Sequence, residues 1–126
     1  MDAGTDIEVL YPSPGVAVVV CSGEHDMTTR EETDRLFGLL VTENDLVVID
    51  LSEARFIDSS FVNNLLKADR LARQQATLVR LQIGSALIVR RVLEISGVVA
   101  KLECVDSREE ALRVVEAEGA DASRGS

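Results

Sequence analysis

The stretch from Phe56 to Ser60 carries the side chains whose types and spacing best suit a chemical role. A carboxylate, Asp58, is followed directly by two hydroxyls, Ser59 and Ser60, and then by apolar residues at helical spacing. One interpretation is a helix N-cap, in which Asp58 or Ser59 accepts hydrogen bonds from backbone N–H groups of the first turn. The other is a phosphorylation site, because a helix N-terminus stabilises an added dianion while the surface gains about two negative charges. The two interpretations are compatible.

Other candidate chemistry is sparse. No pattern of the G-x-x-x-x-G-K, G-x-G-x-x-G or G-x-S-x-G type occurs, so neither phosphate loops, dinucleotide sites nor serine-hydrolase elbows are predicted. The single histidine, His25, follows a strand in a polar segment, which predicts an exposed loop side chain. Cys21 and Cys104 lie far apart in apolar contexts, which predicts two buried thiols without a disulfide. We therefore expect no enzyme, no metal site and no cofactor.

Composition narrows the classes of partner. The 126 residues include 13 Lys and Arg against 22 Asp and Glu, a net charge of −9, which disfavours nucleic-acid backbones and anionic membrane surfaces. The longest apolar runs, Val16–Cys21 and Leu46–Ile49, fall far short of the ~20 residues that span a bilayer. The first residues also lack a basic segment followed by an apolar one, so no secretory signal is predicted. We expect a cytoplasmic protein.

The elements that must position Asp58 and Ser59 follow from hydrophobic periodicity. Strands are predicted at residues 7–11, 16–21, 46–51, 77–83 and 102–105. The first two are separated by prolines and a glycine and should pair as a hairpin. In the fourth, Val79, Leu81 and Ile83 should face one side, and Arg80 and Gln82 the other.

Four helices are predicted between and after these strands. Overlapping capping boxes at Thr28–Glu31 and Thr29–Glu32 open the first, and Ser107-x-x-Glu110 caps the last. Ser85 should cap the third, which ends at Ser96-Gly97. The inward residues are expected to be Leu36, Phe37, Leu40 and Val41 in the first helix; Phe61, Val62, Leu65, Leu66, Ala68 and Ala72 in the second; Leu87, Ile88, Val92 and Ile95 in the third; and Ala111, Leu112 and Val115 in the fourth.

The resulting order is β-β-α-β-α-β-α-β-α, which predicts a single α/β domain with a mixed, mostly parallel sheet and about four helices. We place the domain at residues 7–116, with flexible termini at 1–6 and 119–126. The strand at 7–11 is expected at an edge, where it could pair with another chain.

Four collinear pieces of the sequence resemble STAS domains, above all the bacterial anti-sigma-factor antagonists. The run Val47–Ser60 is similar to the family signature that ends in D-S-[ST], and Gly23–Asp26 is similar to its G-E-L-D loop. Ser85–Val98 resembles the stretch S-P-x-V-R-R-x-L-x-x-x-G-L, and Asp106–Leu112 resembles the closing D-S-x-E-E-A-L. The resemblance spans about residues 7–116 and implies the STAS fold.

The resemblance also implies a function and its residues. In this family a serine-kinase anti-sigma factor phosphorylates the first hydroxyl after the aspartate, which matches Ser59. The unphosphorylated form binds the anti-sigma factor and releases the sigma factor for transcription, as in a stress response; phosphorylation blocks this, and a serine phosphatase restores it. The partner surface would include Asp26, Asp58, Ser60 and the start of the following helix with Phe61.

The sequence departs from the family motif D-S-[ST]-G-[LV]-G at Phe61 and Asn63, which stand where the glycines do, and at His25, which replaces a leucine. Helical spacing with Leu65 and Ala68 predicts an inward Phe61; an outward Phe61 would be an apolar anchor for a partner. Two other roles stay open: a STAS scaffold or sensory-complex subunit without phosphorylation, and a STAS sensor of a small ligand.

Overall fold

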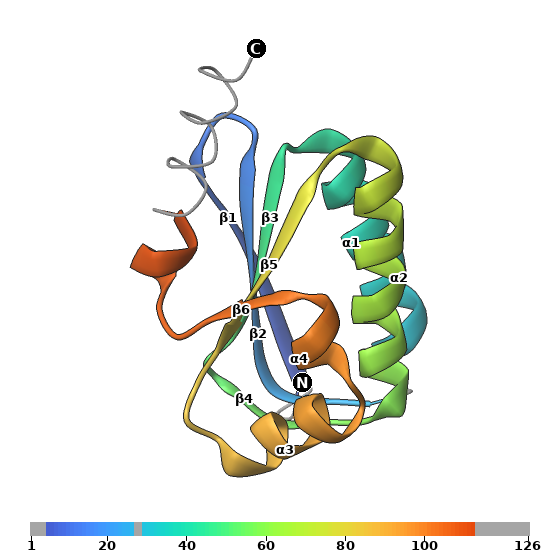
Figure 1. The fold of residues 1–126 in the computed structure, drawn as a ribbon, viewed down its shortest axis with the longest axis vertical. Coiled ribbons are helices and arrows are strands. Elements are labelled where there is room, and N and C mark those ends of the chain that lie inside the picture. Colours follow the sequence, from blue (N-terminus) through green and yellow to red (C-terminus); the bar gives the residue numbers. More distant parts are fainter. Residues whose placement is uncertain (1–4, 27–28, 113–126) are drawn as a thin grey trace.

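A six-stranded sheet runs through the protein, which is a computed structural model that describes residues 5–26 and 29–112 (Figure 1). Its strands are β1 (Thr5–Ser13), β2 (Val16–His25), β3 (Leu46–Leu51), β4 (Ala54–Ile57), β5 (Leu78–Ile83) and β6 (Glu103–Val105). The order across the sheet is β1-β2-β3-β5-β6, and β4 also pairs with β2. Among the strands of the described residues, the β1–β2 hairpin is antiparallel and the other pairs are parallel. The predicted fold class and the hairpin are confirmed.

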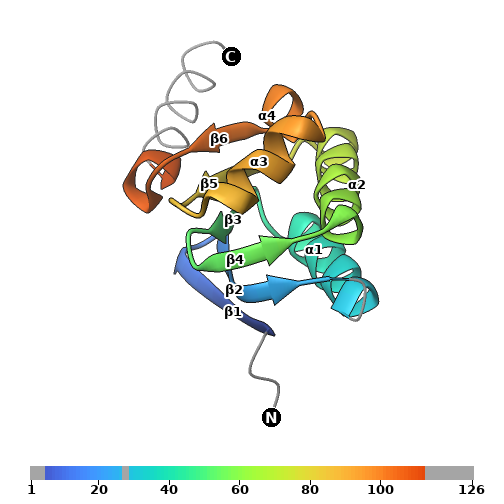
Figure 2. The same cartoon turned by 90° about the horizontal axis from the view of Figure 1, so that it is seen from below.

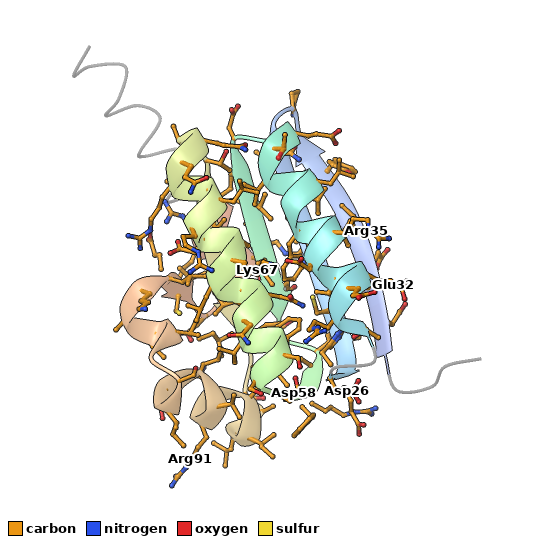
Figure 3. The ribbon with its side chains drawn as sticks, turned by 90° about the vertical axis from the view of Figure 1, so that its right-hand side faces the viewer. Asp26, Glu32, Arg35, Asp58, Lys67 and Arg91 are labelled. Atoms are coloured by element: carbon orange, nitrogen blue, oxygen red, sulfur yellow. The ribbon has the colours of Figure 1, made fainter. Side chains whose placement is uncertain are left out.

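Helices cover the two faces of this sheet unequally. They are α1 (Arg30–Glu43), α2 (Ser59–Gln75), α3 (Leu87–Ile95) and α4 (Val98–Lys101), and residues 108–112 are also helical. The long helices α1 and α2 pack side by side on one face, over the main core (Figures 1 and 3). The predicted inward residues of α1 and α2 lie in or against this core.

The second face of the sheet is also buried, and residues 108–112 pack against it. Ala111 lies with Val18 and Val48 in a smaller apolar cluster. Arg108 binds the buried carboxylate of Asp50 at 2.7 Å. The predicted alternation in β5 is confirmed, and the side expected to be polar lies inside the protein, because this second layer covers it. Ser107 caps the helical segment as predicted, its Oγ accepting from the Glu110 N–H.

Two short elements escaped prediction. β4 has only four residues, Ala54–Ile57, which is too short for an alternating pattern to be recognised in the sequence. Its first and last residues are buried and the two between them are exposed, which is not the alternation of a typical strand. It is a strand because β2 extends beyond its predicted end at Cys21 to His25 and pairs with it. α4 likewise has only four residues, too few to show a helical period.

The inner face of α3 was predicted wrongly for three of its four residues; the fourth, Val92, is partly buried against the main core. Leu87 and Ile95 are 81% and 78% exposed, and Ile88 is also exposed, whereas Val89 and Leu93 are buried. Arg90, Arg91 and Glu94 occupy one side of α3, and its apolar residues spread over an arc wider than the part that the core covers, so the sequence alone does not define which of them face inward. Its N-cap residue is Ala86, not Ser85.

Two further expectations concern the ends of elements. Thr29 makes no capping hydrogen bond to α1; its hydroxyl donates to the backbone oxygen of Asp26. Thr28 and Val115, and the expected flexible segment 119–126, lie outside the described residues. Thr5 and Asp6, expected in a flexible terminus, belong to β1.

Candidate functional site

Asp26 and Asp58 come together because the strands that precede them are paired. In the parallel β2–β4 ladder Glu24 is opposite Phe56, and His25 is opposite Ile57. The next residue of each chain segment is an aspartate, and the N–H of Asp58 donates to the carbonyl oxygen of His25 at 3.2 Å. Both aspartates therefore lie at the same end of the molecule, where α2 begins (Figure 3).

Asp58 is the N-cap of α2, which was one of the two interpretations of this motif. Its Oδ1 accepts hydrogen bonds from the N–H groups of Ser60, at 2.9 Å, and Phe61, at 3.1 Å. Its backbone is extended, as at most N-caps. One carboxylate oxygen thus serves two N–H donors that the helix itself leaves unpaired.

Ser59 is the first residue of α2, and its side chain is exposed. Ser60 beside it is half-buried. The two hydroxyls differ in access, since Ser59 can be reached by a second protein without movement of α2. A phosphoryl group on Ser59 would lie next to the Asp58 carboxylate, at the positive end of the α2 dipole.

Phe61 points into the core and is 2% exposed. Its ring meets Phe37 of α1 edge-on, with centroids 6.0 Å apart. The inward interpretation of Phe61 is confirmed, and its placement on the partner surface is corrected: a buried ring cannot touch a partner directly. Phe61 instead anchors the first turn of α2 to the core.

His25 is also buried, with no exposed surface, so the prediction of an exposed loop histidine was wrong. β2 continues to residue 25 and carries the side chain under the start of α2, where its ring lies 5.2 Å from that of Phe61. Nε2 donates to the backbone oxygen of Ser22 at 2.9 Å, and Nδ1 is buried without a partner among the described residues. Burial lowers the pKa of His25, against the opposing effect of Ser22, Asp26 and Asp6.

An apolar surface that the sequence analysis missed lies beside this site. We call it the α3 patch; its exposed members are Phe56, Leu87, Ile88, Ile95 and Val99. α3 packs on β4, the strand that leads into Asp58, and it lies at the same end of the molecule as the start of α2 (Figures 1 and 2). The sequence did contain an indication of this surface, because α3 has more apolar residues than the side of one short helix can bury against the core. Apolar side chains that are exposed close to one another are a common feature of interaction sites.

The remaining candidate chemistry is weak. Cys21 and Cys104 are free; Cys21 is buried as predicted, whereas Cys104 is only half-buried. Burial raises the pKa of both thiols, more strongly for Cys21 beside Asp50. Within residues 5–26 and 29–112, no cluster of three or more His, Cys, Asp or Glu side chains could hold a metal ion. None of the helices in this part of the chain has the length and apolar character to cross a membrane.

A cleft of about 460 Å³ between α1 and α2 is lined mainly by charged and amide side chains, including Arg30, Asn63 and Lys67.

Comparison with protein families gives one match. A family model described as the STAS domain matches residues 9–111, which include the whole site. No curated protein matches the sequence.

Solved structures with the same fold include several anti-sigma factor antagonists. The anti-sigma factor antagonist SpoIIAA in its unphosphorylated form superposes with a TM-score of 0.77 at 21% identity, covering 89% of this chain and 97% of that one. The phosphorylated form of SpoIIAA, a cell fate determinant of Bacillus, gives 0.69 at 20% identity, covering 87% and 99%. An anti-sigma factor antagonist from Mycobacterium paratuberculosis gives 0.71 at 28% identity, covering 88% and 95%.

Proposed function

The chain belongs to the STAS domain family, and from this premise we propose that it is an anti-sigma-factor antagonist switched by phosphorylation of Ser59. In its unmodified form it binds a serine-kinase anti-sigma factor in the cytoplasm and thereby frees a sigma factor for transcription. The chain acts as a binding module and kinase substrate, not as an enzyme. A serine phosphatase reverses the modification.

The observation that carries this proposal is the exposed hydroxyl of Ser59 at the first position of a helix whose capping is complete without it. Asp58 alone accepts from the Ser60 and Phe61 N–H groups, so modification of Ser59 removes no capping bond. The phosphoryl group would add about two negative charges beside Asp58. The expected result is a protein that stays folded while its surface becomes repulsive to a partner shaped for the neutral serine.

The partner surface follows from what lies around Ser59. Asp26, Asp58 and Ser60 form a polar group at the start of α2, and the α3 patch lies next to it. An apolar area that excludes water beside a polar, charge-sensitive group is the usual anatomy of a regulated interface. In this arrangement the α3 patch provides affinity, and Ser59 decides whether the complex can form.

Intact-mass spectrometry tests the proposal. The purified protein is incubated with ATP and each candidate serine-kinase anti-sigma factor of its source organism, alongside the variants Ser59→Ala and Ser60→Ala. We expect one added phosphate, lost in Ser59→Ala and retained in Ser60→Ala, together with loss of kinase binding after modification. The neighbouring serine is the matched control, because it has the same chemistry but is half-buried.

Other outcomes distinguish the alternatives. A phosphate lost only in Ser60→Ala would move the acceptor by one residue. Tight binding to an anti-sigma factor without any phosphate would favour a scaffold or sensory-complex subunit. A rise in melting temperature with a small ligand, and no protein partner, would favour the ligand sensor.

A further inference from the structure

A second exposed surface lies on the side of the molecule formed by β1 and α1. β1 is an edge strand: among the described residues it pairs only with β2, so backbone groups along its outer side have no strand partner. Next to it is a groove of about 380 Å³ between β1 and α1, lined by Ile7, Val9, Glu32, Arg35, Leu36 and Leu39. Leu39 is 52% exposed on the rim of this groove. We call these six residues, with the outer edge of β1, the β1–α1 face.

The charges of this face complement each other. Glu32 and Arg35 are the charged residues of the groove, and they lie one helical turn apart on the side of α1 toward β1 (Figure 3). Both side chains are exposed. In a two-fold symmetric dimer, the α1 helices of the two copies run in opposite directions. Glu32 of one copy can then lie opposite Arg35 of the other, and the apolar residues of the two grooves can pack against each other.

We propose that the β1–α1 face is a dimer interface for a second copy of this chain. β1 of one protomer pairs antiparallel with β1 of its partner, which extends the sheet through the dimer and satisfies the open edge. Leu36 and Leu39 of the two protomers cover the apolar strip, and Glu32 of one protomer faces Arg35 of its partner. The interface leaves Ser59 and the α3 patch free, so it does not depend on the proposed function.

Sedimentation equilibrium over a wide range of protein concentration tests this proposal. We expect a monomer–dimer equilibrium whose Kd rises about ten-fold in Glu32→Arg and in Arg35→Glu, because each change places like charges opposite each other at two symmetric positions. The double variant Glu32→Arg/Arg35→Glu should return the Kd to within about three-fold of the wild type. The matched control is Glu31→Arg, which makes the same charge change on a residue of α1 that lines the cleft toward α2; its Kd should stay near that of the wild type.

Two further measurements keep the test decisive. Leu39→Asp should weaken the dimer and remain folded, as circular dichroism would show, since this side chain is already exposed. Amide hydrogen exchange along β1 should slow as the protein concentration rises, because the edge becomes paired. A monomer at every concentration would overturn the proposal, and so would a dimer that responds to Glu31→Arg as much as to Glu32→Arg.

Discussion

The ring centroids of His25 and Phe61 lie 5.2 Å apart, beneath the start of α2. Both residues are places where the sequence departs from the STAS pattern, a histidine in place of leucine and a phenylalanine in place of glycine. In the structure these two side chains contact each other, and both are buried from solvent. The larger ring at residue 61 and the polar ring at residue 25 therefore form one packing unit that holds the helix presenting Ser59.

Replacement of Phe61 should be costly although it lies beside an exposed site. Phe61→Ala removes a ring that contacts both His25 and Phe37, and we expect a loss of about 3–5 kcal/mol in the free energy of unfolding. Phe56→Ala is the control, because Phe56 is 36% exposed; it should cost less than about 1 kcal/mol. Urea unfolding measures both. A loss in Phe61→Ala as small as that expected for Phe56→Ala would show that the Phe61 ring is not part of the core.

The capping role of Asp58 can be separated from its charge. Asp58→Ala removes the acceptor of two backbone N–H groups and should cost about 1 kcal/mol of stability. Asp58→Asn also removes the charge but keeps an acceptor oxygen, so its free energy of unfolding should stay near that of the wild type. If the two variants lose stability equally, charge rather than hydrogen bonding stabilises the start of α2.

His25 should make stability depend on pH. Its pKa lies below the ordinary value of 6.5 in the folded protein, chiefly because of burial and despite the carboxylates of Asp26 and Asp6. Below pH 6.5 the unfolded chain takes up a proton that the folded protein resists, so stability falls with falling pH until the folded pKa is passed. The slope from this one group is at most about 1.4 kcal/mol per pH unit.

Unfolding measured between pH 7 and pH 5, for the wild type and His25→Leu, isolates this effect. Leucine cannot titrate, so the variant should lack this part of the pH dependence and keep only the part due to carboxylates. Parallel curves for the two proteins would mean that His25 keeps its ordinary pKa in the fold.

The α3 patch should matter for binding and not for stability. Leu87→Ala and Ile95→Ala remove side chains that are mostly exposed, so the free energy of unfolding should change by less than about 0.5 kcal/mol. If the proposed function holds, affinity for the anti-sigma factor should fall about ten-fold for each. Leu78→Ala is the control, because Leu78 is a partly exposed leucine at the opposite end of the sheet, at the start of β5. Isothermal titration calorimetry would measure the three affinities, and unchanged values for Leu87→Ala and Ile95→Ala would remove α3 from the interface.

Much of the core could be read from the sequence. The β-branched run of β3 and the helical spacing of Phe61, Leu65 and Ala68 each point to burial, and the structure confirms them. The N-cap at Asp58 was also recognisable, because capping depends on residues only two or three positions apart. These features are local in the chain, so the types and spacing of neighbouring residues are enough to define them.

The structure decided what depends on contacts between distant segments. His25 reads as a polar loop residue, and it is buried because β4 extends the pairing of β2 and because Phe61 arrives from another part of the chain. Leu87 and Ile95 read as core residues, and they are exposed because the short helix α3 packs on β4 through Val89 and Leu93 instead. Periodicity tells which residues share a face, but whether that face is covered depends on which element packs against it, and only the tertiary structure supplies that neighbour.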